Sequence, residues 1–339
     1  MQLRRLAAVA DPLRSLKQPL RNGVGDLVAF ARITAARRRR QAAGDLEGAV
    51  LDYAKLVTSV QFSRESLETY RRIDALLEAH AETLGHHLPD ERLPETLVLF
   101  VGQSRSGHSL VGSLIDAHPD AVIAHEIHAL KHLLRGAALA EVSRAIRLNA
   151  HLFDLLGRAY TGYDYQVPGQ WQGRCRDLLV IGDKKGNGTT RLLRRHPQGL
   201  ARVEARLGLP IRFINVIRHP LDNIATKAMR TGVSLAEAAR RFLANAETLA
   251  TLTRDRPDQV RTVYLDALTA EPKAVLADLV GWLGLSPDVP GYLDASAGLV
   301  FARPKRTRDQ VDWPPRLIDS IRRDLARYPA LARFADEAA

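Results

Sequence analysis

Five short apolar runs, separated by longer segments, set the pattern of the chain from residue 95 onward. The runs are Leu97–Val101, Ala121–Ala124, Leu178–Ile181, Ile211–Ile217 and Val260–Leu265. Continuous apolar runs of this length are typical of strands buried on both faces, and the segments between them are long enough for crossover helices. The pattern therefore predicts an α/β fold in three layers, with one parallel five-stranded sheet and helices on both of its faces.

Residues 1–94 follow a different pattern. They are rich in Ala, Leu and Arg, they contain the run Arg37–Arg40, and they hold no strand signal. Apolar residues recur at helical spacing over Leu46–Val60 and Leu67–Leu77. We therefore expect a helical basic arm followed by an α/β domain at residues 95–339. The Arg run is either a solvated helix face or linker, or a contact to anionic lipid or another polyanion.

The first apolar run leads into a turn rich in Gly and Ser, Gly102–Gly107, and the helical pattern resumes at His108. Such a junction binds anions, because the helix N-terminus leaves N–H groups unpaired and carries partial positive charge. The glycine spacing is that of a P-loop, but His108 stands where a nucleoside triphosphatase has its Lys. Arg105, Ser106 and Ser109 remain as donors for one phosphate-like group without a metal. The alternative is an ordinary strand–helix turn.

A second candidate anion site follows the fourth apolar run. Arg218 ends that run, and His219-Pro220 begins a helix with Pro at a favourable early position. Thr226 lies about two turns into the helix. We expect Arg218 and Thr226 to hold a second phosphate together; the alternative is that Arg218 pairs with Asp222 at the start of the helix.

Charge and cysteine content narrow the partners and the compartment. The formal net charge is +11, mostly from Arg, which indicates anionic partners such as nucleotides, sulfated or phosphorylated substrates, nucleic acid or an acidic membrane surface. Cys175 is the single cysteine, so an intramolecular disulfide and a Cys-rich zinc site are excluded. With no apolar run long enough to span a bilayer, we expect a cytoplasmic protein, peripheral to the membrane if the arm binds lipid.

Three stretches of the chain resemble motifs of the sulfotransferase family. VGQSRSGHSLVGSLIDAHP looks like the 5′-phosphosulfate loop of the family, and VIRHPLDNIATKAM looks like its 3′-phosphate motif. VRTVYLDALTAEPKAVLADLVGWLGL is similar to its late strand, acidic loop and helix end. The matches occur in family order over residues 97–285. The resemblance implies a P-loop-kinase-like fold, 3′-phosphoadenosine 5′-phosphosulfate (PAPS) as co-substrate, adenosine 3′,5′-bisphosphate (PAP) as product, and sulfuryl transfer to a hydroxyl or amine without a metal.

The resemblance also assigns residues to the co-substrate. The implied residues of the 5′-phosphosulfate loop are Gln103, Ser104, Arg105, Ser106, Gly107, His108 and Ser109. Arg105 takes the place of the family's Lys or Arg on the 5′-phosphate and sulfonate, while Arg218 and Thr226 take the 3′-phosphate. The basic segment 301–308 is expected to close over that phosphate through Arg303, Lys305 or Arg306, although it lacks the family's Arg-Lys-Gly signature.

Catalytic roles follow from the same resemblance. Glu126, after the second apolar run, occupies the position of a catalytic Glu in several sulfotransferases and is our candidate base, with His125 and His128 as the other candidates. The alternative for Glu126 is an acid that stabilises a helix N-terminus. Lys184 in the stretch GDKK is expected to contact the sulfonate or the acceptor; the alternative is a surface turn in which Lys184 and Lys185 are solvated.

The chain departs from the family pattern at three places: His108 replaces Thr, Thr226 replaces Ser, and the arm has no counterpart. Two other functions therefore stay open, a P-loop nucleotide kinase or nucleotidase and a non-catalytic nucleotide- or polyanion-binding protein. We expect a small-molecule, lipid or glycan acceptor and no nucleic acid. The arm is a candidate for dimerisation, and the aromatic stretch from Tyr160 to Trp171 is a candidate for the acceptor pocket.

Overall fold

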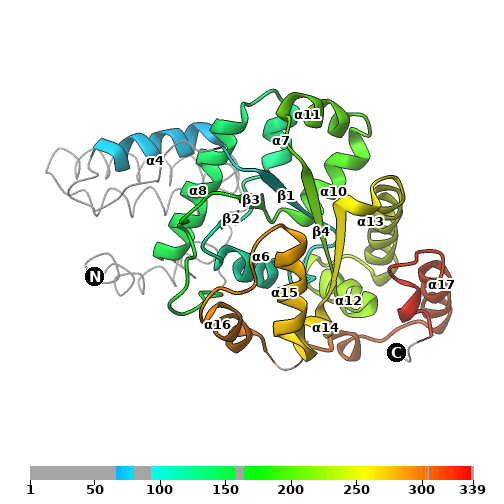
Figure 1. The fold of residues 1–339 in the computed structure, drawn as a ribbon. Coiled ribbons are helices and arrows are strands. Elements are labelled where there is room, and N and C mark those ends of the chain that lie inside the picture. Colours follow the sequence, from blue (N-terminus) through cyan, green and yellow to red (C-terminus); the bar gives the residue numbers. More distant parts are fainter. Residues whose placement is uncertain (1–65, 80–92, 157–163, 302, 304, 337–339) are drawn as a thin grey trace, which may run out of the picture.

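The computed structural model describes residues 66–79, 93–156, 164–301, 303 and 305–336 of the chain. Its centre is a five-stranded sheet in the order β2-β3-β1-β4-β5, and every neighbouring pair is parallel (Figure 1). The strands are β1 Thr96–Val101, β2 Ala121–Ala124, β3 Val180–Asp183, β4 Ile211–Ile217 and β5 Val260–Tyr264. The predicted α/β class and all five predicted strands are thereby confirmed. Three strands differ at their ends from the predicted runs: β1 begins one residue earlier, β3 lies two residues later, and β5 ends at Tyr264.

The central strand β1 shows why the sheet needs a layer on each face. All of its apolar residues from Leu97 to Val101 are buried. Leu97, Leu99 and Val101 belong to one hydrophobic cluster, whereas Val98 and Phe100 belong to another. Successive side chains of a strand point to opposite faces, so an uninterrupted apolar run requires cover on both sides.

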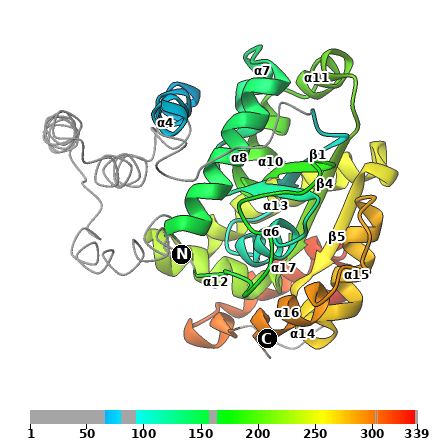
Figure 2. The ribbon, with the colours of Figure 1, turned by 60° about the vertical axis from the view of Figure 1, so that its left-hand side comes forward.

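Helices supply that cover on each face (Figures 1 and 2). The first cluster is completed by α7 Ala129–Leu134, α8 Leu139–Leu156, α10 Gly186–Arg195 and α11 Gly199–Leu207. The second is completed by α6 His108–Asp116, α14 Leu265–Ala270, α15 Pro272–Trp282 and α16 Tyr292–Leu299. A third cluster joins α12 Pro220–Thr231, α13 Leu235–Asp255 and α17 Pro315–Leu325. The helices predicted to begin near His108 and Pro220 are confirmed as α6 and α12.

Of the predicted arm, the structure describes α4 Leu67–Ala79, which confirms the second stretch of helical spacing. Tyr70 of α4 is buried in the first cluster, and Asp74 pairs with Arg144 of α8. The predicted helix at Leu46–Val60 and the run Arg37–Arg40 lie outside the described residues. None of the described helices is both long and apolar enough to cross a bilayer.

Candidate functional site

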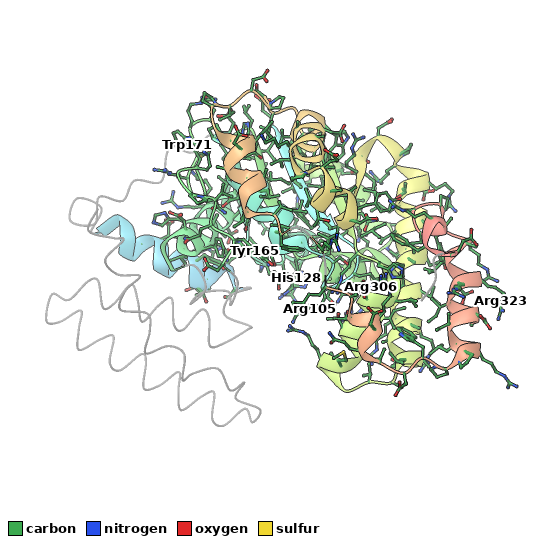
Figure 3. The ribbon with its side chains drawn as sticks, turned by 90° about the horizontal axis from the view of Figure 1, so that it is seen from below. Arg105, His128, Tyr165, Trp171, Arg306 and Arg323 are labelled. Carbon is green, nitrogen blue, oxygen red and sulfur yellow. The ribbon has the colours of Figure 1, made fainter. Side chains whose placement is uncertain are left out.

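The candidate site lies where β1, β3 and β4 end. These three strands are neighbours in a parallel sheet, so their carboxyl ends and the loops that follow share one edge, which is where open α/β sheets bind ligands. Figure 3 looks from below, and Arg105, His128 and Arg306, which come from three different loops, fall in the same region of the view. Trp171 and Arg323 fall toward opposite ends of the molecule.

The turn after β1 has the backbone of an anion-binding loop. Gly102 and Gly107 have φ of 113° and 104°, and Arg105 has φ of 69°. A Cβ on Gly102 would lie 2.7 Å from Oδ1 of Asn215, so both the conformation and the space require glycine there. Gly107 is the N-cap of α6 and makes no side-chain cap hydrogen bond. The first turn of α6 is therefore not capped by its N-cap side chain, as an anion site requires.

Contacts from α10 and α13 brace the first half of the turn. The N–H of Gly102 donates to Oγ1 of Thr190 at 2.8 Å. The side chain of Gln103 is buried, donates to the carbonyl of Phe242 at 2.7 Å and accepts from Asn245 at 3.1 Å. Gln103, a predicted co-substrate residue, thus uses its side chain to brace the turn.

Contacts from α12 brace the second half. Nδ2 of Asn223 donates to the carbonyl of Ser104 at 2.8 Å and to Oγ of Ser106 at 3.1 Å. Ser106 is buried, whereas Arg105 between the two serines is exposed. A non-glycine residue with positive φ costs free energy and persists only where its neighbours over-determine it. Here both neighbours of Arg105 are anchored by Asn223, which fixes the guanidinium-bearing residue at the outer side of the turn.

His108 does not replace the missing Lys as a cation. Its ring is buried against Phe100 and Gly186, and Nε2 donates to the carbonyl of Val101 at 2.9 Å. Burial lowers the pKa of His108 to about 4, with the hydrogen bond to Val101 opposing that shift. The imidazole is therefore neutral at pH 7 and packs beneath the turn.

Lys184 brings the positive charge that His108 does not. It follows β3, only 3% of its side chain is exposed, and Nζ donates to Oγ of Ser109 at 2.6 Å. Nζ also lies 3.4 Å from Oε1 of Glu126, and Nζ of Lys185 lies 3.1 Å from Oε2. The structure thus joins the predicted residues Ser109, Lys184 and Glu126 in one contact network, and the alternative of two solvated lysines in a surface turn is wrong for Lys184.

The loop that carries Glu126 is held in a strained backbone. Glu126 and His128 have φ of 67° and 66°. Asp183, the last residue of β3, accepts hydrogen bonds from the N–H groups of Ile127 at 3.0 Å and Ala129 at 2.8 Å. Burial raises the pKa of Asp183 to about 6. Strain of this kind is found where surrounding contacts enforce a functional geometry.

The other candidate bases lie differently around this loop. The N–H of His125 donates to Oδ1 of Asn149 at 2.5 Å, and its ring stacks on Phe153 with centroids 3.6 Å apart. His125 is buried and its ring faces the core. His128 is half-buried and falls in the same region of Figure 3 as Arg105. Of the two histidines, His128 is therefore the one whose side chain is less buried, and its ring lies near Gly188 of α10.

The residues of the second predicted anion site meet after β4. Nη1 of Arg218 donates to Oγ1 of Thr226 at 3.2 Å, so the two residues that we expect to share a phosphate lie side by side. Nη2 of Arg218 donates to Oγ1 of Thr307 at 3.1 Å and to the carbonyl of Lys305. The hydroxyls of Thr226 and Thr307 are 2.8 Å apart. Burial lowers the pKa of Arg218, with Asp222 opposing that shift.

The alternative in which Arg218 pairs with Asp222 is wrong, because Arg308 holds that carboxylate. Nη1 of Arg308 lies 2.8 Å from Oδ2 of Asp222, and the N–H of Arg308 donates to Oδ1 at 2.8 Å. Thr307 donates to the carbonyl of Asp222 at 2.8 Å, and Nε1 of Trp313 donates to the carbonyl of Arg308 at 2.9 Å. The segment 305–313 is thereby fastened to α12.

Thr307 and Arg308 were missed by sequence reasoning, which chose Arg303, Lys305 and Arg306 from the same basic segment. All three of those residues are exposed, and Arg306 pairs with Asp309 at 2.9 Å. The sequence did point to the right segment, because the predicted basic stretch 301–308 includes both residues. The residue within it that meets Asp222 depends on how two distant parts of the chain pack.

The aromatic stretch lies only partly within the described residues, because 157–163 are outside them. Tyr165 and Trp171 are half-buried, and Tyr165 packs against the second hydrophobic cluster. The guanidinium of Arg174 lies 5.3 Å from the ring centroid of Trp171. Trp171 falls far from His128 in Figure 3, so it does not line the site at the strand ends.

No protein-family model matches the chain. No curated protein matches its sequence. Among solved structures, the chain is similar to the sulfotransferase domain of an olefin synthase from Synechococcus PCC 7002, with a TM-score of 0.43 and 17% identity over 75% of this chain and 99% of that chain. It is also similar to a sulfotransferase from Alicyclobacillus acidocaldarius, with a TM-score of 0.39 and 16% identity over 72% of this chain and 97% of that chain. A sulfotransferase from Mycobacterium avium gives a TM-score of 0.42 and 11% identity over 83% of this chain and 84% of that chain. All three likenesses are distant.

Proposed function

We propose that this protein transfers the sulfuryl group of PAPS to a hydroxyl or amine of an acceptor. The observation that carries the proposal is a pair of donor clusters at the ends of the neighbouring strands β1 and β4, each suited to an anion, with a buried Lys and a Glu beside the first. PAPS has one phosphate at the 3′ position and a phosphosulfate at the 5′ position, so it needs two such sites. The resemblance of the two motifs to the sulfotransferase family supports the same assignment.

The turn 102–107 would hold the 5′-phosphosulfate. Its donors are the backbone N–H groups at the start of α6, the guanidinium of Arg105, and the ammonium of Lys184 at the hydroxyl of Ser109. Negative charge develops on the oxygen that links phosphate to sulfur as that bond breaks, and fixed donors aimed at such charge lower the barrier. A neutral His108 and a Ser109 engaged by Lys184 do not reproduce the Lys and the magnesium-binding hydroxyl of a P-loop kinase.

The cluster of Arg218, Thr226 and Thr307 would hold the 3′-phosphate. One guanidinium and two hydroxyls supply directed donors to a phosphate, and the guanidinium matches its geometry better than an ammonium does. In the structure Arg218 also donates to the carbonyl of Lys305. A phosphate would compete for these donors, so we expect the segment 305–313 to adjust when the nucleotide binds.

In the transfer step, Glu126 would accept the proton of the acceptor hydroxyl or amine. The oxygen or nitrogen lone pair forms the new bond to sulfur, while the electrons of the sulfur–oxygen bond leave with PAP. Lys184 lies within hydrogen-bonding range of both Ser109 and Glu126, so a single ammonium connects the loop on the leaving-group side to the base. Holding both reactants here contributes by fixing their orientation.

The experiment is a calorimetric titration of the protein with PAP, with adenosine 5′-phosphate as the matched ligand that lacks the 3′-phosphate. We expect PAP to bind more tightly. Replacing Arg218 by Ala removes one charge-assisted contact, which is worth roughly 1.5–3 kcal/mol, so PAP affinity should fall about 10- to 150-fold. The affinity for adenosine 5′-phosphate should change little. Arg256→Ala is the control, because Arg256 is a partly buried Arg that pairs with Glu204 away from the strand ends.

Equal losses for the two ligands, or PAP binding that Arg218→Ala leaves unchanged, would refute the 3′-phosphate assignment. Transfer is tested with labelled PAPS and a panel of lipid, glycan and aromatic acceptors. Glu126→Gln keeps the size of the side chain and removes the base, so the transfer rate should fall about 10²- to 10⁴-fold while PAP affinity stays within about twofold. Transfer at the wild-type rate after Glu126→Gln would remove Glu126 from the mechanism.

A further inference from the structure

We propose that the acceptor is an anionic glycan and that its carboxylate or sulfate groups bind a cluster of four cations beside the site. This cationic cluster consists of Arg191 and Arg194 on α10, Lys227 on α12 and Arg241 on α13. The inference rests on the proposed function, because it identifies the class of acceptor that the same site would take. It is carried by where the cations lie and by the absence, among the described residues, of an ion pair at Arg191 and Lys227.

Three asparagines bring three helices together at the turn 102–107. Asn223 of α12 donates to Ser104 and Ser106. Asn245 of α13 donates to Oε1 of Gln103 at 3.1 Å and to Oδ1 of Asn187 of α10 at 2.8 Å. α13 packs against both α10 and α12 (Figure 1). The three helices therefore meet at the outer side of the anion-binding turn.

Each of these asparagines has a cation four residues away on the same helix. Arg191 follows Asn187, Lys227 follows Asn223, and Arg241 precedes Asn245. Residues four apart lie on the same face of a helix, about 6 Å apart along its axis. The faces that meet at the turn therefore carry the three cations one helical turn further out.

Arg194 is the fourth member of the cationic cluster. Its Nη1 donates to Oδ1 of Asn245 at 3.1 Å, which joins it to the same asparagine network. Arg191, Arg194 and Arg241 are exposed, and Lys227 is half-buried. All four side chains are thus at or near the surface, where a ligand can reach them.

The charges in the cationic cluster act on one another and are poorly compensated. The pKa of Lys227 is lowered first by burial and then by Arg241, Arg191 and Arg194, and Glu237 opposes the shift. Glu237 is already paired with Arg241 at 2.6 Å and with Arg240. Within the described part of the chain, neither Arg191 nor Lys227 forms an ion pair. Crowded like charges are unfavourable without a counter-charge, and an anionic ligand supplies one.

The donor does not account for these cations, because its 5′ and 3′ groups have their own sites at the turn and at Arg218. Nucleic acid is less suited, since proteins that bind single strands combine cations with aromatic side chains on which bases stack. α10, α12 and α13 contain one aromatic residue, Phe242, which is only 2% exposed. A glycan offers acceptor hydroxyls and regularly spaced anionic groups on the same chain.

The test uses the full-length protein and three probes: an unsulfated hexuronate oligosaccharide, the same oligosaccharide after reduction of its carboxyl groups, and a sulfated oligosaccharide of equal length. We expect wild type to bind one or both charged probes and not the neutral one; the pair separates carboxylate from sulfate recognition. In Arg191→Gln/Lys227→Gln, affinity for the charged probe should fall about tenfold, and the slope of log affinity against log salt should fall by roughly two. PAP affinity should stay within about twofold.

The matched control is Lys273→Gln/Arg323→Gln, which removes the same charge from α15 and α17. Four results would each overturn the proposal. The control could lose as much affinity as the cluster variant, or wild type could bind the neutral probe as tightly as the charged ones. Wild type could also bind no glycan, or it could bind a single-stranded oligonucleotide more tightly through the cationic cluster. If the charged glycan binds through the cluster but PAP does not bind, the proposed function fails and the glycan site stands. If PAP binds and the cluster variant leaves glycan affinity unchanged, this inference alone fails.

Discussion

Replacing Arg308 by Ala is expected to destabilise the fold by loosening the segment 305–313 from α12. In the pair that this change breaks, only 10% of the Arg308 side chain and 3% of the Asp222 side chain are exposed. Asp222 would keep one partner, the backbone N–H of residue 308, and would lose the guanidinium. The variant therefore tests whether a buried charge pair fastens the segment beside Arg218 and Thr226.

The expected size follows from these contacts. Removing one partner of a buried ion pair costs roughly 3–5 kcal/mol when the remaining charge stays buried. The segment lies at the surface, however, and can lift to let water reach Asp222, which lowers the cost. One charge-assisted hydrogen bond is lost outright, so we expect about 2–3 kcal/mol in the free energy of unfolding. For a domain of this size, that corresponds to a melting temperature lower by about 4–12 °C.

Urea unfolding followed by circular dichroism gives the free energy, and limited proteolysis reports whether the segment 305–313 is cut faster. Arg306→Ala is the control in the same segment, because its pair with Asp309 is exposed and should change stability by less than about 1 kcal/mol. A double-mutant cycle with Asp222→Asn isolates the coupling between the two side chains. If Arg308→Ala unfolds and is cut like wild type, or if the coupling is below about 0.5 kcal/mol, the segment is not held by this pair.

Two further predictions concern the buried charges of the site and the core. Lys184→Met keeps the length of the side chain and removes the ammonium, so sulfuryl transfer should fall about 10²- to 10³-fold. A smaller loss than in Lys185→Met would contradict the role of Lys184. Burial raises the pKa of Asp116 to about 7 from 3.8, so the folded state keeps a proton that the unfolded chain releases, and this contribution to stability is lost as pH rises from about 4 to 7. In Asp116→Asn, the free energy of unfolding should therefore fall less between pH 4 and 7, by up to roughly 4 kcal/mol. If the free energy of unfolding of this variant depends on pH as it does in wild type, Asp116 is not the titrating group.

The sheet could be predicted because a strand that is buried on both faces appears in the sequence as a continuous apolar run. The same apolar-run criterion, however, placed β3 two residues too early. The predicted run Leu178–Ile181 stops where apolar residues stop, whereas β3 continues through Gly182 and Asp183. Gly182 is required because a Cβ there would lie 2.7–2.8 Å from Ile123 and from the carbonyl of Val98. Asp183 is a buried carboxylate that binds two N–H groups of the Glu126 loop. An apolar-run criterion excludes both residue types, so the residue that positions the candidate base was hidden.

The predictable part of the site consists of contacts within one strand–helix junction. Arg218 and Thr226 are eight residues apart, so their hydrogen bond follows from local geometry. Thr307 meets Thr226 across 81 residues, and that contact depends on the path of the chain through β5 and α16. The braces from Asn223 and Asn245 are long-range in the same sense. Short polar residues in helices carry no signal that tells a bracing side chain from a solvated one.

At this site the positive charge is carried by Lys184, and residue 108 of the turn is a neutral His. This arrangement gives the site a property that a P-loop with its own Lys lacks. A Lys at position 108 would lie at the start of α6, on a different element from the strand that positions Glu126. Here the cation is Lys184, the residue that follows β3, and Asp183, the last residue of β3, fixes the loop of Glu126. Lys184 and Asp183 are adjacent in sequence and held by the same parallel register, with Leu99 of β1 opposite Asp183. β3 lies between β1 and β2, so the distance from the turn 102–107 to Glu126 is set through β3 and its pairing with each of these strands. A change that shifts β3 against β1 should therefore misplace the cation and the carboxylate together.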